Sequence, residues 1–283
     1  MAEPRIRPAT DADIEPAWEI LAAANLGPWY ELSAEQFRGW WWPSYKALWV
    51  AEEDAVVGYS ATRGDMVEAY VLPEARRRGI GSRLLAEAEA AVEGPVVEAT
   101  TRRDESAARP FLEGHGYEHC AETWVLQVDL EEDVPAPSWP DGLTVRSFRP
   151  GEEEQVKALL DAAYANEPDF NPGTLEGWKS FMLADPSFEP ESWFVAEEPD
   201  GALAGAALNW RDGFVKDLVV RPELQGRGVG KALLLHTFGH FKARGLPRVA
   251  LKTDSRNTSQ AWRFYEHMGM RKTRTYDDWR KRR

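Results

Sequence analysis

The stretch VVRPELQGRGVGKALL, residues 219–234, places glycines at 226, 228 and 230 between two apolar segments. Glycine accepts backbone conformations that other residues avoid, and the first amide groups of a helix have no partner within the helix. A glycine-rich turn that leads into a helix therefore presents several N–H groups to an anion, usually a phosphate. The stretch predicts a strand, an anion-binding turn and a helix. A second stretch, YVLPEARRRGIGSRLL at 70–85, repeats this pattern with variations.

The rest of the chain repeats around these two loops. The corresponding segments are 5–25 and 143–164, 47–63 and 192–210, 65–71 and 214–220, 79–93 and 228–244, and 95–101 and 248–254. Their patterns predict, in order, a strand with a helix, a hairpin, a strand, a long helix and a strand. A short helix and a last strand end each half. Segment 131–142 is acidic and proline-rich, as linkers between domains are, so we expect an N-terminal domain at 1–130 and a C-terminal domain at 143–283.

The composition excludes several classes of protein. The chain has 283 residues, of which 43% are hydrophobic and 29% charged, enough for two globular domains. Residues 1–140 hold 12 Lys and Arg against 26 Asp and Glu, a net charge of −14, and residues 141–283 hold 22 against 21, a net charge of +1. This balance argues against a nucleic-acid partner. No apolar run is long enough to span a membrane, and a single cysteine, Cys120, fits a reducing compartment, so we expect a cytoplasmic protein with no membrane partner.

Two familiar phosphate-binding motifs do not fit the second loop. A Walker-type loop needs a glycine five residues before Gly230 and a hydroxyl residue after Lys231, but the chain has Gln225 and Ala232 there. A dinucleotide fingerprint needs its third glycine one residue later. The pattern that fits is Arg or Gln, two residues, Gly, one residue, Gly, at 76–81 and again at 225–230.

With these loops, the chain resembles the GNAT superfamily of acyl-CoA-dependent N-acyltransferases. Two further motifs support the resemblance: Val-x-Pro-Glu before each loop, at 71–74 and 220–223, and Tyr-x-x-x-Gly followed by an apolar residue at 265–270. The resemblance covers nearly the whole chain as two copies. It implies an α/β (α+β) fold of two tandem GNAT-type domains, each a mixed, mostly antiparallel twisted sheet flanked by helices.

The resemblance implies acetyl-CoA as cofactor. The pyrophosphate would bind at the loop residues Gln225, Gly226, Arg227, Gly228, Val229, Gly230 and Lys231, and in the first copy at Arg76, Arg77, Arg78, Gly79, Ile80, Gly81 and Ser82. The strand before each loop would pair its backbone with the pantetheine arm, through Leu218, Val219 and Val220 and equally through Ala69, Tyr70 and Val71. A backbone N–H near Leu218 would polarise the thioester carbonyl. Asn257 resembles the family's cofactor-contacting asparagine, and it is equally well explained as a helix cap.

The resemblance also implies a general acid, a tyrosine on the short helix after the fifth strand of the domain. In the second copy this residue is Tyr265, whereas the first copy has Leu112, which cannot donate a proton. The base is Asp217 by resemblance, with Glu68 and Asp65 as candidates in the first copy. Regular strand alternation puts Asp217 on the face opposite Leu218, unless a bulge intervenes, so a structural role for Asp217 remains open.

Alternation also places Phe214 and Lys216 on the face of Leu218. His236 and His240 are four residues apart, but no third ligand has suitable spacing, so we predict no metal site. The adjacent Trp40, Trp41 and Trp42 cannot share one helical face, so at least one should reach a pocket or an interface. The resemblance implies that this region shapes the acceptor pocket, and packing between the two copies is the alternative.

These observations predict an N-acetyltransferase that moves acetyl from acetyl-CoA to a primary amine of a small molecule or peptide. The chemistry would lie in the C-terminal half, with the first copy catalytically degraded, and the protein would be a monomer or a homodimer. The alternative is a non-catalytic acyl-CoA-binding or sensing protein, which Leu112 and the lack of an obvious base favour.

Overall fold

A computed structural model of the chain describes residues 3–24, 33–131, 133–167 and 170–283. Its residues form two compact units. The first unit contains residues 1–123 and 275–283, and the second contains residues 124–274. Residue 25 of the predicted segment 5–25 and residue 132 of the predicted linker 131–142 lie outside the described residues.

The first unit is a mixed sheet with helices. Its elements are β1 (Arg5–Pro8), α1 (Ile14–Ala24), α2 (Ala34–Gln36), β2 (Ala47–Glu52), β3 (Val56–Arg63), β4 (Met66–Val71), α3 (Ile80–Ala90), β5 (Val96–Arg102), α4 (Ala108–Gly114) and the start of β6 (Glu118–Asp129). The strand order is β1-β2-β3-β4-β5-β12-β6. Strands β1 to β4 pair antiparallel with one another, and β4 and β5 are parallel.

The second unit repeats this plan. Its elements are β7 (Thr144–Ser147), α5 (Glu153–Tyr164), α6 (Leu175–Met182), β8 (Phe194–Glu197), β9 (Leu203–Asn209), β10 (Phe214–Val220), α7 (Val229–Ala243), β11 (Arg248–Asp254), α8 (Ala261–His267) and the start of β12 (Arg271–Arg282). The strand order is β6-β11-β10-β9-β8-β7, and β10 and β11 are parallel.

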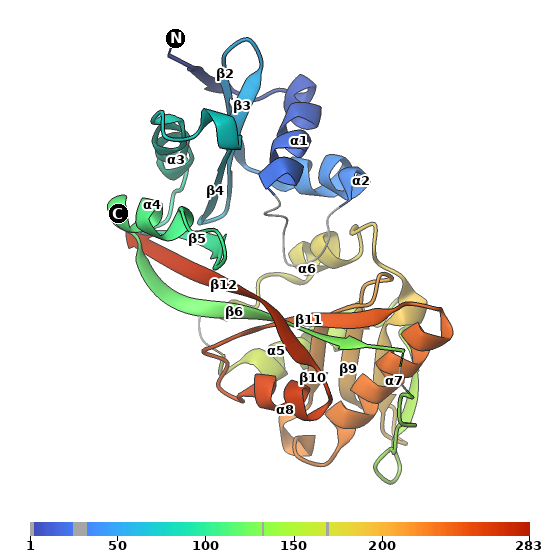
Figure 1. Cartoon of the computed structure of the whole chain (residues 1–283). Helices are drawn as coiled ribbons and strands as arrows, with labels where there is room; N and C mark the ends of the chain where they lie inside the picture. Colours follow the sequence, from blue (N-terminus) through green and yellow to red (C-terminus); the bar gives the residue numbers. More distant parts are fainter. Residues whose placement is uncertain (1–2, 25–32, 132, 168–169) are drawn as a thin grey trace. The chain divides into compact units, whose positions relative to one another are not determined.

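Each sheet carries helices on both faces. In the first unit, Val50 packs in the cluster of α1, and the next residue, Ala51, packs in the cluster of α3. Successive strand residues point to opposite faces, so α1 and α3 cover opposite sides of β2–β4 (Figure 1). The predicted fold class, two tandem domains of mixed, mostly antiparallel sheet flanked by helices, is confirmed.

An ion-pair cluster occurs once in each unit. Arg7 binds Asp13 at 2.8 Å and Glu52 at 2.9 Å, joining β1 to the turn before α1 and to β2. In the second unit Arg146 binds Glu152 at 2.7 Å and Glu197 at 2.6 Å in the same arrangement. The internal duplication predicted from the sequence therefore extends to individual side-chain contacts.

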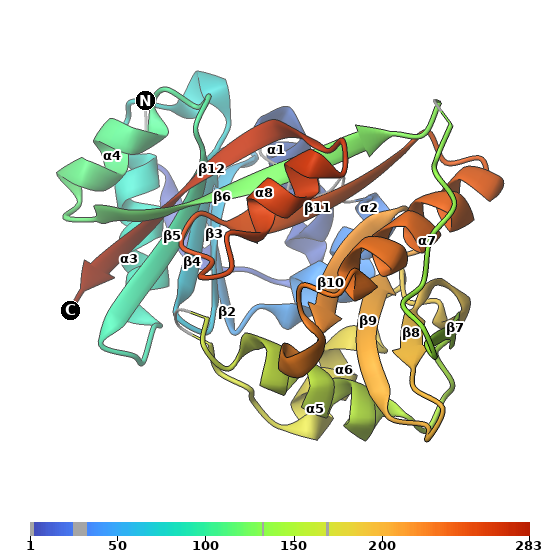
Figure 2. The same cartoon turned by 90° about the horizontal axis from the view of Figure 1, so that it is seen from below.

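The last strand of each half extends into the other unit. Strand β6 passes into the second unit at Trp124, and β12 passes into the first unit at Thr275. In the first unit β12 pairs antiparallel with β5 and lies between β5 and β6 in the sheet (Figure 2). The units thus differ from the predicted segments 1–130 and 143–283 by an exchange of strands. Hydrophobic alternation predicts that a segment is a strand but does not specify its neighbour.

The described helices are all too short or too polar to cross a membrane.

Candidate active site

The two glycine loops have the same backbone geometry. Gly79 and Gly228 precede α3 and α7 with φ of 79° and 91°, in the left-handed region that glycine tolerates. The first turn of each helix therefore begins directly after the loop, with its free N–H groups at the helix end. Partial positive charge at this end favours an anion such as a pyrophosphate.

Two of the predicted cofactor-binding side chains hold the loop to the preceding strand. Arg76 Nε donates to the carbonyl of Val71 at 3.0 Å, and Gln225 Nε2 donates to the carbonyl of Val220 at 3.2 Å. These positions correspond in the two copies. The arginine or glutamine at the start of the motif thus holds the turn in place. The groups available to bind the cofactor are the backbone N–H groups of the loop and the side chains that follow.

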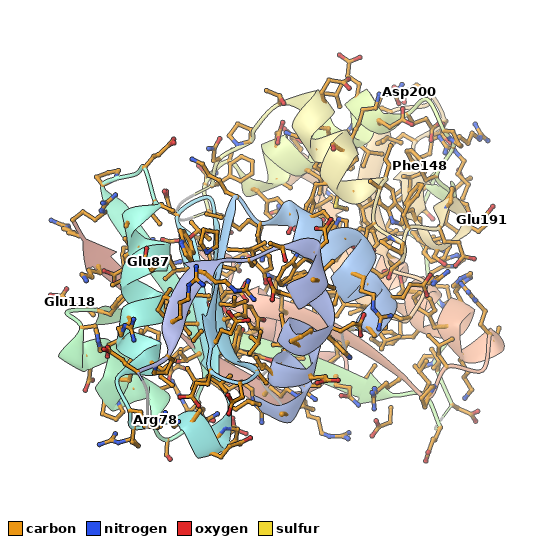
Figure 3. All side chains as sticks on the ribbon, turned by 90° about the horizontal axis from the view of Figure 1, so that it is seen from above. Arg78, Glu87, Glu118, Phe148, Glu191 and Asp200 are labelled. Carbon is orange, nitrogen blue, oxygen red and sulfur yellow. The ribbon has the colours of Figure 1, made fainter. Side chains whose placement is uncertain are left out.

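The charged loop residues differ in their availability. Arg78, labelled in Figure 3, pairs with Glu53. Arg77 is exposed, and so are Arg227 and Lys231 in the second unit. The exposed cations are the ones whose positions suit a phosphate arriving from solvent.

A cavity of about 510 Å³ runs through the first unit from the glycine loop to the sheet. Strands β4 and β5 pair only at Met66 and Glu98, so they separate towards their carboxyl ends. The cavity occupies this gap, and its walls include most of the first-copy residues predicted to bind the cofactor: Ala69, Tyr70, Val71, Arg76, Arg77, Gly79, Gly81 and Ser82. Arg78 and Ile80 are not among its walls. Leu112, where the second copy has Tyr265, also lines it.

Strand β10 of the second unit carries a bulge. Val215 pairs with Asn209 and Asp217 with Leu208, which leaves Lys216 as the extra residue. Val215 and Leu218 therefore both pack on the side of α7, so the prediction that Phe214 and Lys216 share the face of Leu218 is wrong. In the first unit the pairing of β3 with β4 is regular from Met66 to Val71.

Asp217 and two tyrosines form a polar cluster in the second unit. Tyr164 Oη, at the end of α5, donates to Asp217 Oδ1 at 3.0 Å, and Lys216 Nζ lies 3.4 Å from Asp217 Oδ2. Tyr265 on α8 is 9% exposed, and burial, together with the negative charge of Asp217, raises its pKa above the usual range. Tyr265 therefore keeps its proton at neutral pH, as a general acid must before it acts.

A similar pair occupies the first unit. Tyr45 Oη donates to Glu68 Oε2 at 3.0 Å, and burial raises the pKa of Glu68. Glu68 and Asp217 hold corresponding strand positions, each with a tyrosine hydroxyl. The tyrosine partners Tyr45 and Tyr164 were missed by sequence reasoning, because they come from non-corresponding elements and no motif includes them.

The remaining predicted residues lie in simpler surroundings. Asn257 Oδ1 accepts from the amide of Ala261 at 3.1 Å, which caps the start of α8. Trp41 lines the cavity of the first unit, at the end of a π-helical turn, and donates to Tyr45. Trp42 is buried against Phe37.

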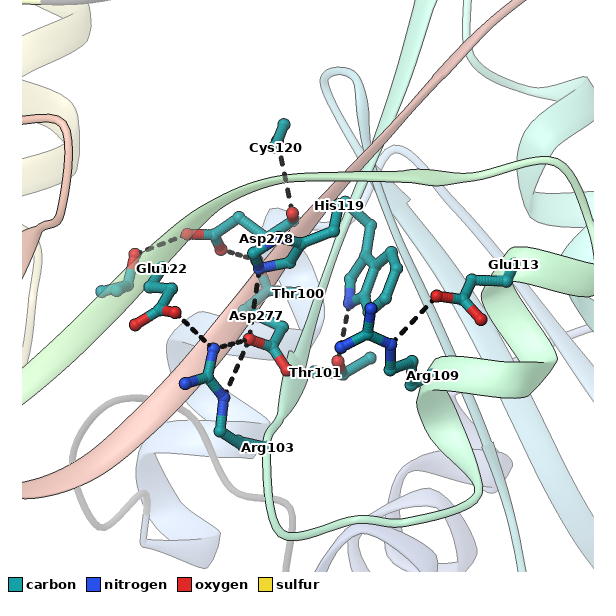
Figure 4. Close-up of polar contacts among 12 residues, drawn as sticks. Thr100, Thr101, Arg103, Arg109, Glu113, His119, Cys120, Glu122, Asp277 and Asp278 are labelled. Carbon is teal, nitrogen blue, oxygen red and sulfur yellow. Dashed lines mark hydrogen bonds and ion pairs between the residues drawn. The ribbon is translucent and has the colours of Figure 1, made fainter.

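One histidine and two carboxylates lie close together at one place in the described part of the chain. His119, Glu122 and Asp277 have ligand-type atoms close together. Arg103 pairs with both Glu122 and Asp277, so a guanidinium already supplies the positive charge there (Figure 4). His236 instead packs its ring against Phe194, with centroids 4.5 Å apart.

The fold and the loops define a class of protein, and comparison with known families agrees. The model of the Acetyltransferase (GNAT) family matches residues 155–270, and that of an Acetyltransferase (GNAT) domain matches residues 44–119. The chain belongs to the GNAT family in a tandem form, and it is an acetyltransferase that uses acetyl-CoA as its donor.

The most informative relatives are more particular. A mycothiol acetyltransferase of Nocardioides sp. is 32% identical over 222 residues, which span 71% of this chain and 75% of the relative. A mycothiol acetyltransferase of Thermobispora bispora is 35% identical over 213 residues, 71% of each chain. The tandem arrangement of the chain thus resembles that of mycothiol synthase.

Solved structures share the fold over the whole chain. A GCN5-related N-acetyltransferase from Sphaerobacter thermophilus has a TM-score of 0.78 at 27% identity, covering 99% of this chain and 95% of its own. A tandem GNAT protein from the clavulanic acid biosynthesis pathway has a TM-score of 0.75 at 18% identity, covering 99% and 98%.

Proposed function

We propose that the second unit transfers acetyl from acetyl-CoA to the primary amine of a small molecule or peptide. The observation that carries this proposal is the buried, protonated Tyr265 beside the carboxylate of Asp217. Amine acetylation requires a base that takes a proton from the amine and an acid that gives a proton to the leaving thiolate.

In this proposal the backbone binds the cofactor. The loop from Gln225 to Lys231 takes the pyrophosphate at the start of α7, with Arg227 and Lys231 adding charge. Leu218, Val219 and Val220 pair with the pantetheine arm, and Asn257 caps the helix that carries the acid. The bulge at Lys216 re-aims the amides that follow it, so that the N–H near Leu218 faces the thioester carbonyl.

The chemical step then balances as follows. The amine nitrogen attacks the thioester carbon, and Asp217 accepts the proton that the nitrogen loses. The carbon–sulfur bond breaks, and Tyr265 donates its proton to the leaving thiolate. The hydrogen bond from Tyr164 keeps the Asp217 carboxylate oriented for this role.

For the first unit we propose acyl-CoA binding without an acid. The cavity beside Ala69, Tyr70 and Val71 and the loop from Arg76 to Ser82 support a cofactor site, whereas Leu112 has no proton to give. Calorimetry tests this part. Two acetyl-CoA sites per chain are expected, and a single site that persists in a variant with an altered second loop would assign it to the first unit.

The acceptor is sought with a panel of amines. It holds polyamines, aminoglycosides, amino acids, cysteinyl sugars and N-terminal peptides, and the names of the relatives, mycothiol acetyltransferases, support adding a precursor of mycothiol. The experiment measures release of the free CoA thiol in the presence of each amine, for the wild-type chain and for Tyr265→Phe. Tyr117→Phe is the matched control, because Tyr117 is a buried tyrosine of the first unit.

The outcomes separate the two functions. Amine-dependent release that falls at least a hundredfold in Tyr265→Phe and not in Tyr117→Phe supports the proposal. Saturable acetyl-CoA binding with no release for any amine would support the non-catalytic acyl-CoA-binding protein instead. Release that ignores Tyr265→Phe would keep the enzyme and remove the assigned acid.

A further inference from the structure

The inner end of the first unit's cavity contains two opposite charges that do not make a hydrogen bond. Arg63 Nη2 lies 3.8 Å from Glu68 Oε1, and both side chains line the cavity. Their side chains are 32% and 15% exposed. A charge pair that is mostly withdrawn from water is costly unless hydrogen bonds satisfy both partners.

Each of the two charged groups can make hydrogen bonds beyond those it makes within the protein. Glu68 Oε2 accepts from the Tyr45 hydroxyl, the carboxylate also has a hydrogen bond from Tyr70, and Oε1 lies 3.8 Å from the guanidinium. Arg63 Cζ lies over Trp41, 4.1 Å from the ring centroid, and Arg63 Nη1 lies 3.5 Å from Ser44 Oγ. The guanidinium fork therefore has donors left, and the carboxylate, which has about four lone-pair sites, can accept a further hydrogen bond.

Apolar and aromatic side chains surround this pair. Leu21, Trp41, Tyr70 and Tyr276 line the same cavity. Tyr70 is fixed against Tyr59, with ring centroids 5.1 Å apart.

Tyr276 comes from the exchanged strand, and its neighbours are anchored within the first unit. Asp277 pairs with Arg103, and Asp278 accepts from Thr100 at 2.8 Å and from Thr123 at 2.7 Å (Figure 4). The wall at Tyr276 is therefore set by a network of polar contacts.

From this arrangement we propose that the first unit binds a free α-amino acid with an apolar or aromatic side chain. The ligand carboxylate bonds to the Arg63 guanidinium, the ligand ammonium bonds to Glu68 Oε1, and the side chain packs among the rings of Trp41, Tyr70 and Tyr276. The site lies at the opposite end of the cavity from the glycine loop.

Charge balance selects a zwitterion over a simple amine. A lone ammonium beside Glu68 would leave Arg63 as an extra positive charge in a partly buried site, and a lone carboxylate would leave Glu68 uncompensated. A zwitterion supplies one partner to each, and planar carboxylate recognition is what a guanidinium does best. At 3.8 Å the two side chains share no hydrogen bond, so none between them has to break when the ligand bonds to both.

Isothermal titration calorimetry on the full chain tests this site. The probes are L-phenylalanine and L-leucine, with phenethylamine and 3-phenylpropionate as analogues that lack one charge. We expect saturable binding of at least one amino acid, at least tenfold tighter than either analogue. Glu68→Gln and Arg63→Gln should each weaken amino-acid binding at least tenfold, while Tyr117→Phe should leave it unchanged.

Several results would overturn the proposal. They are no binding of either amino acid to the wild-type chain, equal binding of phenethylamine, or unchanged binding in both charge variants. If Glu68→Gln fails to fold, Arg63→Gln decides, since Arg63 is the more exposed of the pair. Tyr265→Phe separates this site from the proposed chemistry, because it should abolish acetyl transfer and leave amino-acid binding intact.

Discussion

Tyr276 in the last strand lies directly opposite Arg102 in β5, and this antiparallel pairing continues to Arg282 opposite Val96. The sheet of the first unit is therefore completed by residues that follow the whole second unit in sequence. The stability of the N-terminal fold must depend on side chains at the C-terminal end of the chain.

Trp279 provides the sharpest test of this dependence. It is 1% exposed, belongs to the same core cluster as Leu85 and Tyr117, and donates from Nε1 to Thr101 at 2.8 Å. Replacing a buried tryptophan by alanine costs about 3–5 kcal/mol. For Trp279→Ala we expect a loss of this size, with amide hydrogen-exchange protection lost in α3 and β5.

Phe181→Ala is the control, since Phe181 is 44% exposed and surface substitutions change stability by about 0.5 kcal/mol or less. If Trp279→Ala leaves the protection of α3 and β5 intact, the first unit does not rely on the exchanged strand.

The two glycine loops differ at one strained position. Arg77 has a φ of 64°, where the second copy places Gly226 with a φ of 75°. A left-handed conformation costs a non-glycine residue about 1–2 kcal/mol. Replacement by glycine removes this cost, but about 0.5–1 kcal/mol of the gain is offset because glycine makes the unfolded chain more flexible. Arg77→Gly should therefore raise the free energy of unfolding by about 0.5–1 kcal/mol in urea titrations.

The reverse substitution should have the opposite sign. A Cβ at Gly226 meets no atom within 4 Å, so Gly226→Ala reports backbone strain alone, and we expect a loss of about 1 kcal/mol. Arg77→Ala controls for the charge, because it removes the guanidinium and keeps the strain. A gain in Arg77→Ala equal to that in Arg77→Gly would mean that charge, not φ, determines stability here.

Local patterns of the sequence account for much of the architecture. Both loops and both helices that follow them are predicted by the glycine spacing, which occurs at 226, 228 and 230 and again at 79 and 81. These are short-range features, in which the residues that specify the turn are those that form it. The duplication follows from the same motifs, because each copy carries them in the same order.

Long-range choices could not be predicted from these patterns. Which sheet receives Trp279 depends on pairing energies between strands far apart in the chain, and the alternation of apolar residues is the same in either sheet. The bulge at Lys216 shifts the faces of Val215 and Leu218, yet no residue type there requires it. The hydrogen bonds of Tyr45 and Tyr164 to the two strand carboxylates arise only when separate elements pack together.

The ion-pair cluster of the first unit predicts an acid-sensitive stability. The hydrogen bonds from Arg7 lower the pKa of Asp13 to about 2, and the Asp13 side chain is only 5% exposed. A carboxyl whose pKa is lower in the folded chain stabilises the fold above its unfolded pKa of about 4, and this contribution disappears as the pH falls through the folded value. The shift corresponds to about 2.5 kcal/mol.

Urea unfolding at a series of pH values between 7 and 2 measures this contribution. Asp13→Asn should lose about 2.5 kcal/mol at pH 7 and differ little from wild type at pH 2. Asp11→Asn, an exposed substitution in the same turn, is the control. A constant difference between wild type and Asp13→Asn across the pH range would show that packing, not ionisation, explains the loss.

The protonation of Tyr265 gives a direct spectroscopic prediction. Burial is the main cause of its raised pKa, and the charge of Asp217 adds to it. The phenol therefore stays neutral through pH 10, where an ordinary tyrosine is half ionised. The difference in tyrosinate absorbance between wild type and Tyr265→Phe isolates this residue, and we expect no ionisation step below pH 10.

Asp217→Asn removes the nearby negative charge and keeps a similar shape. It should move the ionisation of Tyr265 to lower pH, because the tyrosinate is no longer opposed by a carboxylate. The same substitution should also lower the rate of acetyl transfer, because it removes the proposed base. The rate and the titration of Tyr265 therefore change for different reasons, and each is measured separately. An ionisation step of Tyr265 between pH 7 and 9 in the wild-type chain would contradict the assignment of this tyrosine as an acid that is fully protonated when the thiolate leaves.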